Sequence, residues 1–135
     1  MKATEYVSEL VAKYPSIREI WLIGSRANGS ATADSDWDYL AFADEKTFKS
    51  LKLDQRFNRD GVDLMVVRDG VNFASPWTDG NRQKQGTLAK TGCGWDWKRC
   101  SPTRATYRAT KLENSGVQRV ETQCAFRVFP PEATV

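Results

Sequence analysis

The first half of the chain alternates between two hydrophobic patterns. In residues 4–14, apolar side chains recur at the spacing of an amphipathic helix, and Pro15 ends the segment because it cannot continue the helical hydrogen-bond ladder. Residues 17–23 form a short apolar run with the β-branched and aromatic content of a largely buried strand. Small polar residues over 26–36 predict a loop that can hold one helical turn, and a strand resumes over 37–43.

One more helix and one more strand follow. Residues 46–53 are typical of a short helix. Residues 57–67 predict a hairpin-like return, with Asp60-Gly61 as its turn and 62–67 as a third strand. This part of the pattern therefore extends the predicted sheet by one strand.

The pattern is weaker in the second half. Ser75-Pro76 can cap and begin a helix, and the polar residues 79–90 fit either a helix or a loop. Residues 105–112 and 117–129 alternate between polar and apolar side chains, with turn-forming residues between them, and predict a terminal β-hairpin. Ser101-Pro102 offers the alternative of a helix in place of the first arm.

These elements predict an α/β (α+β) fold: a short mixed β-sheet flanked by helices, with a C-terminal β-hairpin appendage. A chain of 135 residues has room for one ordinary domain, and 40% apolar with 27% charged residues is an ordinary globular composition. The longest apolar run is well short of the roughly 18 residues of a membrane span, and the N-terminus lacks the plan of a signal peptide. We expect a cytoplasmic protein without a membrane partner.

The absence of histidine narrows the chemistry available. Imidazole-based triads and His-ligated zinc are excluded. Cys93, Cys100 and Cys124 fit neither a zinc pattern nor a disulfide framework, so we expect them to pack as small reduced hydrophobic residues. Any enzyme chemistry must then rest on carboxylates.

Charge is unevenly distributed along the chain. Residues 1–70 carry 12 acidic and 10 basic side chains, whereas residues 71–135 carry 5 acidic and 10 basic ones. A basic second half suits a phosphate-rich partner, although an ordinary solvated surface explains it equally well. Likewise, the aromatic and basic residues interleaved between Trp95 and Lys111 fit either a base-stacking surface or a small core under the hairpin.

Three aspartates are placed to act together. Asp36 and Asp38 flank Trp37 at the start of a strand, and strand alternation sends both carboxylates to one face. Asp63 is the second residue of the third strand and reaches the same point if the two strands pair. Converging carboxylates form the hard oxygen environment that suits Mg²⁺.

A candidate phosphate site precedes these aspartates. Gly24-Ser25 ends the first strand and opens a possible helical turn, where backbone N–H groups and a hydroxyl can hold phosphate oxygens. Arg26 can add a charge-assisted contact. A phosphate cradle beside metal-binding carboxylates is suited to phosphoryl or nucleotidyl transfer.

The sequence resembles the three-part signature of the polymerase-β-like nucleotidyltransferase superfamily, and it is most similar to the minimal members. The three parts are Gly24-Ser25 followed by a short loop, Asp36-Trp37-Asp38, and the later strand aspartate Asp63. The resemblance covers residues 19–67. Asn28 departs from the second basic residue of many small members, and the residues after Gly70 do not match their helical tail.

The resemblance implies a nucleotidyltransferase-like fold, with residues 1–70 as the catalytic core and 71–135 as a basic C-terminal extension completing the same domain. It implies that Gly24 and Ser25, with Arg26, bind the triphosphate of a nucleoside triphosphate such as ATP, and that the three aspartates bind two Mg²⁺ ions. It also implies that Asp63 helps to deprotonate an acceptor hydroxyl, on a nucleic acid such as RNA or on a protein.

Two alternatives from other classes stay open at this stage. The chain could keep the fold without turnover and act as a binding, inhibitor or antitoxin-like protein, or it could be a nucleic-acid-binding domain. The local pattern Asp-x-Asp by itself is more often an exposed turn before a strand.

Overall fold

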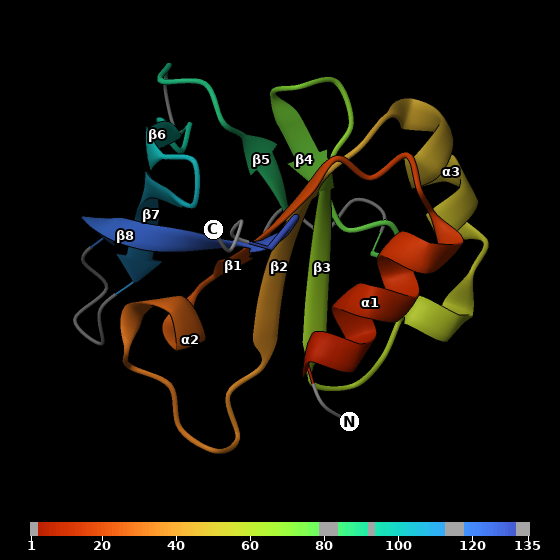
Figure 1. The fold of residues 1–135 in the computed structure, drawn as a ribbon. Coiled ribbons are helices and arrows are strands. Elements are labelled where there is room, and N and C mark those ends of the chain that lie inside the picture. The colour runs from red at the N-terminus through yellow and green to blue at the C-terminus, as the bar shows by residue number, and fades with distance from the viewer. Residues whose placement is uncertain (1–2, 79–83, 92–93, 113–117, 132–135) are drawn as a thin grey trace.

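A computed structural model of the protein describes residues 3–78, 84–91, 94–112 and 118–131. Within these ranges the chain forms one mixed eight-stranded sheet with three α-helices (Figure 1). The helices are α1 (Ala3–Lys13), α2 (Ser25–Asn28) and α3 (Glu45–Lys52), with a 3-10 turn, η1 (Gln55–Phe57). The strands are β1 (Glu19–Ile23), β2 (Trp37–Phe42), β3 (Val62–Val67), β4 (Asn72–Ala74), β5 (Gln85–Thr87), β6 (Lys98–Ser101), β7 (Arg104–Leu112) and β8 (Gln118–Phe129).

The sheet order is β5-β4-β3-β2-β1-β8-β7-β6. Strands β2 and β3 run parallel and are joined through α3, whereas the other described pairs are antiparallel. Because parallel strands start at the same edge of a sheet, the first residues of β2 and β3 lie side by side. The register places Asp38 opposite Asp63.

Alternation along the strands divides the core between the two faces of the sheet. On one face, α1 and α3 pack on the central strands through Tyr6, Leu10, Phe48 and Leu51, all fully or nearly fully buried. The described core of the other face contains no helical residue, because strands and loops of both halves of the chain fill it. Its buried members are Trp21, Ile23, Leu40, Phe42, Val67, Phe73, Leu88, Ala105, Tyr107 and Ala125.

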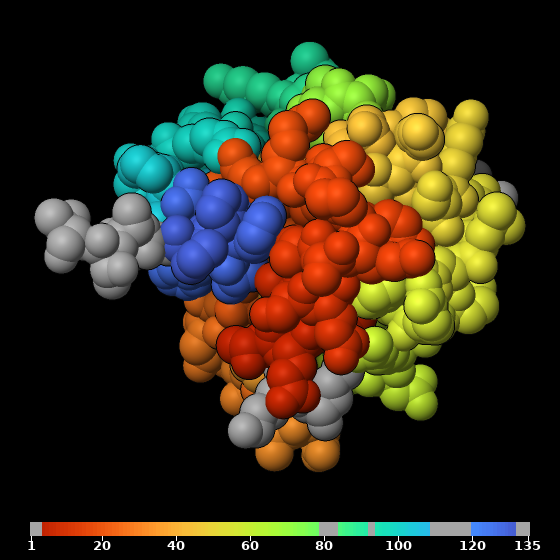
Figure 2. Space-filling model, turned by 45° about the vertical axis from the view of Figure 1, so that its right-hand side comes forward, coloured from red at the N-terminus to blue at the C-terminus, as the bar shows by residue number. Residues whose placement is uncertain are grey.

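The C-terminal strand is built into the middle of the sheet. β8 pairs with β1 on one side and with β7 on the other. In Figure 1, β8 lies across the direction of β2 and β3, which shows how strongly the sheet curls. Figure 2 shows the same strand, in blue, beside the red and orange N-terminal segments, although nearly the whole chain separates them in sequence.

The helices and strands predicted in the first half are confirmed within a few residues, as α1, β1, β2, α3 and β3. The single helical turn allowed in the loop is α2. The hairpin-like return over 57–67 is wrong: Phe57 belongs to η1, and 62–67 pairs in parallel with β2. The connection through α3 lets β3 run parallel to β2, and the Asp60-Gly61 turn only precedes the first residue of β3.

The second half requires larger corrections. The α+β class and the mixed sheet are confirmed, but the sheet has eight strands and is not short. Helices α1 and α3 pack on one of its faces. The β7–β8 hairpin exists but is no appendage, because β8 pairs with β1. Ser75-Pro76 begins no helix. Residues 85–87 of the polar segment form strand β5, which neither the helix nor the loop interpretation predicts. Residues 79–83 and the expected turn at 113–116 lie outside the described residues.

Candidate active site

Two of the three predicted carboxylates are brought together by the parallel pairing. Asp38 and Asp63 are direct register partners on β2 and β3, and both side chains are partly buried. Asp36 lies just before β2 and is exposed. Burial first, and then the charges of Asp63 and Asp36, raise the pKa of Asp38 to about 6. The three carboxylates therefore concentrate negative charge at this end of β2 and β3, and a cation is needed to balance it.

A lysine from the second half faces this charge. Lys84 forms a salt bridge with Asp63, and its positive charge also lowers the pKa of Asp38, opposing the larger effects that raise it. The sequence analysis did not single out Lys84, because it lies in the polar segment 79–90, which has no periodic pattern. Only the pairing of β4 with β3 and of β5 with β4 brings it to the site.

The Gly24-Ser25 turn lies against the same carboxylates. Gly24 has a φ of 74°, in the left-handed region that favours glycine, and it precedes α2 without a side-chain cap. A Cβ built on Gly24 would collide with the carboxylate of Asp38, lying 3.1 Å from its Cγ. Glycine is thus required twice at this position, by the backbone conformation and by the close approach of Asp38.

Residues of the C-terminal hairpin hold this turn in place. The Gly24 N–H donates to the Tyr107 hydroxyl at 2.9 Å. The Asn28 side chain donates to the Gly24 carbonyl at 2.8 Å and accepts from the Cys124 N–H at 2.8 Å. Tyr107 is 4% exposed, and burial raises its pKa, so it remains a neutral hydroxyl. The sequence analysis placed Tyr107 in the aromatic and basic segment 95–111 without connecting it to Gly24, and it gave Asn28 no positive role.

Arg26 holds the loop that leads to Asp36. Its guanidinium donates to the Ser35 carbonyl through Nε at 3.1 Å and Nη2 at 2.8 Å, and it lies 4.2 Å from the centre of the Trp37 ring. These contacts are local to this loop and differ from the phosphate contact that the sequence predicts for Arg26. They give Arg26 a role in positioning Asp36, and a nucleotide contact from it stays a prediction.

The donor set is compatible with magnesium, although the site is not assembled as a three-ligand cluster. Among the described residues there is no group of three or more His, Cys, Asp or Glu side chains placed to hold a metal ion. Asp38 and Asp63 nevertheless offer adjacent oxygens whose charges repel each other. Mg²⁺ commonly takes one or two carboxylates and completes its octahedron with waters and substrate phosphates. The Asp38 and Asp63 carboxylates therefore fit the ion, and Asp36 as a third ligand stays a prediction.

Tyr107 is part of the core, and Trp95 and Trp97 are partly buried and pack against it, so these rings do not form an exposed stacking surface. Trp95 packs against Tyr107 with ring centres 4.6 Å apart, and Trp97 meets Trp21 edge-on at 5.1 Å. This decides between the two interpretations of that segment. The expectation for the cysteines is wrong in part: Cys100 and Cys124 are free but exposed, and Cys93 lies outside the described residues.

The comparison with protein-family models places the predicted motifs within a known family. The sequence model of the family described as Polymerase beta, Nucleotidyltransferase matches residues 5–74, about half of the chain. A crystal structure described as "a putative nucleotidyltransferase from Sulfolobus solfataricus" is 27% identical in sequence, with a TM-score of 0.43. The match covers 68% of this chain and 80% of the chain in that crystal structure. No curated protein matches the sequence. Within the described ranges, every helix is too short or too polar to serve as a membrane span.

Proposed function

This chain belongs to the Polymerase beta, Nucleotidyltransferase family, and from that membership we propose that it transfers a nucleoside monophosphate from a nucleoside triphosphate to a hydroxyl acceptor in a Mg²⁺-dependent reaction. The acceptor oxygen bonds to the α-phosphorus, the bond to the bridging oxygen breaks, and pyrophosphate leaves. The single observation that carries the proposal is the register of β2 and β3, which sets Asp38 beside Asp63 next to the Gly24 turn.

In this proposal the carboxylates divide the work. Asp36, Asp38 and Asp63 hold two Mg²⁺ ions, which when bound supply positive charge for the departing phosphates and acidify the acceptor hydroxyl. Asp63 orients that hydroxyl and helps to take its proton. Asp38 must be ionised to bind a cation, and its pKa of about 6 leaves it mostly ionised at neutral pH.

The Gly24-Ser25 turn is the proposed triphosphate site. The Ser25 hydroxyl and N–H can bind phosphate oxygens, whereas the Gly24 N–H donates to Tyr107. The lack of a side chain at Gly24 keeps the carboxylates within reach of those oxygens. Tyr107 and Asn28 keep the turn in a fixed conformation before the nucleotide arrives. Arg26 contributes through the loop that carries Asp36, and as a direct nucleotide ligand only if its loop contacts open.

The acceptor is the least constrained part of the proposal. The basic second half of the chain favours a nucleic acid, such as RNA, over a neutral small molecule. A hydroxyl on a partner protein is the other candidate, since it needs only an approach to the same carboxylates.

Labelling tests this function directly. Each of the four α-labelled ribonucleoside triphosphates is incubated with the protein, Mg²⁺ and a cell lysate, and label is followed in the RNA and protein fractions. We expect transfer with at least one nucleotide and a loss of about 100-fold or more in Asp38→Asn and in Asp63→Asn. Asp34→Asn, an exposed aspartate in the preceding loop, is the matched control and should keep the wild-type rate.

A non-catalytic binding protein is the second candidate, and a specific observation favours it. Asp63 is already paired with Lys84, and no three-ligand metal group is assembled among the described residues. This candidate predicts nucleotide binding without label transfer from any of the four nucleotides. That result from a folded wild-type protein would reject the transferase.

A further inference from the structure

Lys84 is the feature of the site that the family signature does not contain. Its ammonium group pairs with Asp63, and the two side chains are 30% and 34% exposed. Its charge also acts on Asp38. The Lys84 ammonium therefore pairs with Asp63 and also acts electrostatically on Asp38. It lies where a divalent cation is expected to bind.

The pairing of β3, β4 and β5 brings the Lys84 backbone close to the start of β3. β4 runs antiparallel to β3, with Val66 opposite Ala74, so the chain after Ala74 heads back toward the Asp63 end of β3. β5 then pairs with β4, with Gln85 opposite Ala74. The Ser75 N–H donates to the Lys84 carbonyl at 2.8 Å, which fixes the Lys84 backbone one position beyond that pair.

We propose that Lys84 is a built-in counter-cation, which holds Asp63 in the nucleotide-free protein, competes there with the divalent cation, and turns to the triphosphate once the metal takes the carboxylate. This inference rests on the proposed nucleotidyltransferase function for its last step. A lysine suits the exchange because its ammonium is a single charge on a flexible stem that can move between neighbouring oxygens.

The proposal predicts effects of opposite sign on the two ligands. Removing the positive charge removes a competitor and a repulsive neighbour of the metal, so the bare cation should bind more tightly. The same change removes a charge-assisted contact to phosphate, so the nucleotide should bind more weakly. A salt bridge with a purely structural role would not tighten metal binding while weakening nucleotide binding.

The test compares Lys84→Gln and Lys84→Met with the wild type and with Lys49→Gln. Lys49 is exposed on α3, which follows the far end of β2, so its substitution makes the same change in net charge away from the carboxylates. Binding of Mn²⁺ alone is measured by electron paramagnetic resonance. Binding of a non-hydrolysable triphosphate analogue with Mg²⁺ is measured by calorimetry, and circular dichroism confirms folding.

We expect both neutral Lys84 variants to bind Mn²⁺ about tenfold more tightly and the analogue about tenfold more weakly than the wild type. Lys49→Gln should match the wild type in both assays. Unchanged or weaker Mn²⁺ binding in the folded Lys84 variants overturns the proposal, as does the absence of Mn²⁺ binding by every protein. The Mn²⁺ assay needs no turnover. A wild type that transfers no label would therefore reject the transferase, while Mn²⁺ binding would still decide whether Lys84 competes with the metal at Asp63.

Discussion

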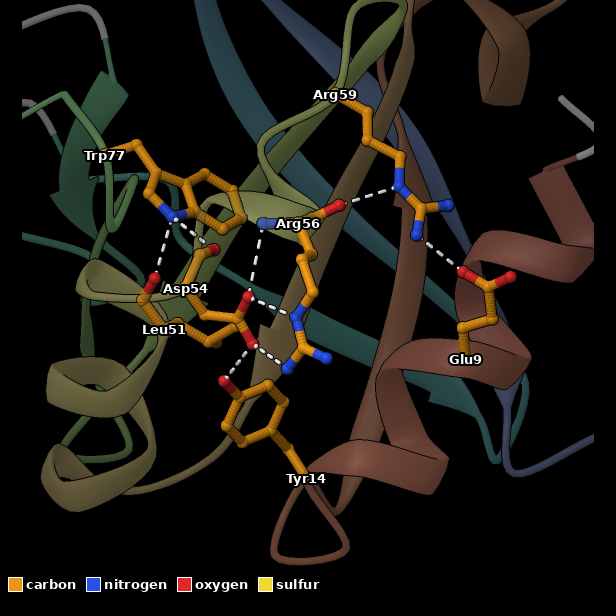
Figure 3. A network of polar contacts seen from close by, with 7 residues as sticks. All are labelled: Glu9, Tyr14, Leu51, Asp54, Arg56, Arg59 and Trp77. Carbon is orange, nitrogen blue, oxygen red and sulfur yellow. Dashed lines mark hydrogen bonds and ion pairs between the residues drawn. The ribbon is translucent and has the colours of Figure 1, made fainter.

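Asp54 and Asp38 are both partly buried aspartates, but their surroundings act on them in opposite directions. The Asp54 carboxylate accepts from the Tyr14 hydroxyl at 2.6 Å and from the Arg56 side chain at 2.9 and 2.8 Å (Figure 3). These donors hold the pKa of Asp54 far below its usual range. Asp38 instead faces Asp63 and Asp36 in a half-buried position, and its pKa is raised to about 6.

The network around Asp54 also ties distant segments together. Figure 3 shows the Trp77 indole donating to the Leu51 carbonyl at 2.7 Å, and Arg59 pairing with Glu9 of α1 at 2.6 Å. The segment after β4, the end of α3 and the first helix are thereby joined around η1. Donors and acceptors are matched here, which is the arrangement expected of a group that stabilises the fold.

The contrast separates a carboxylate that stabilises the fold from one that is a candidate for function. At Asp54 the ionised form has its partners within the chain. At Asp38 the ionised form is opposed first by burial and then by like charges, and Lys84 offsets these effects only in part. Strongly perturbed groups of the second kind are typical of sites that bind a ligand.

Replacing Asp54 should cause the greatest loss of stability. Asp54→Ala removes charge-assisted hydrogen bonds and leaves the Tyr14 hydroxyl without its partner, so we expect a loss of about 3 kcal/mol in the free energy of unfolding. Because the folded pKa of Asp54 is lowered, its contribution is fully present above its unfolded pKa and is lost as the pH falls through the folded pKa. Urea unfolding at pH 7 and pH 3 measures both effects.

An exposed aspartate provides the control for the Asp54 substitution. Asp34→Ala, at an exposed loop aspartate, serves as the control and should change the free energy of unfolding by less than about 0.5 kcal/mol. If Asp54→Ala lost no more than this control at pH 7, the network would not be a stabilising one.

Replacing Asp38 should act in the opposite direction. Its folded pKa is raised, so ionisation at neutral pH opposes folding, and Asp38→Asn should raise the free energy of unfolding by about 1 to 2 kcal/mol at pH 7.5 after allowance for solvent screening. The gain should shrink as the pH falls through the folded pKa of about 6 and should disappear below about pH 3, where Asp38 is protonated in both the folded and the unfolded state. Thermal melts across this pH range measure it, and a destabilised variant at pH 7.5 would contradict the contrast drawn with Asp54.

Removing the Tyr107 hydroxyl should give the smallest effect. Tyr107→Phe keeps the ring stacked on Trp95 but leaves the Gly24 N–H without its acceptor, so we expect a loss of about 1 kcal/mol and weaker nucleotide binding. Tyr39→Phe, at a buried tyrosine on the other face of the sheet, is a control for loss of a hydroxyl. Equal nucleotide affinity in Tyr107→Phe and the wild type would mean that the hairpin supports the turn only structurally.

The sequence predicted most of the first half and little of the second. Helices α1 and α3 and strands β1, β2 and β3 have clear periodicity over five or more residues, so pattern alone identified them. Strands β4, β5 and β6 have three or four residues each, too few for periodicity to distinguish them from loops. The hairpin of β7 and β8 was predicted, but its place beside β1 was not.

The same division runs through the site. The sequence by itself determined which residue types could carry the chemistry: Gly24, Asp36, Asp38 and Asp63 are recognisable because each stands at a predicted strand end. Only the tertiary structure brought Lys84 to Asp63 and Tyr107 to Gly24, across 21 and 83 residues of sequence. Local pattern encodes which face of a strand a side chain occupies, whereas the partners of that face depend on the order and direction in which distant strands pair.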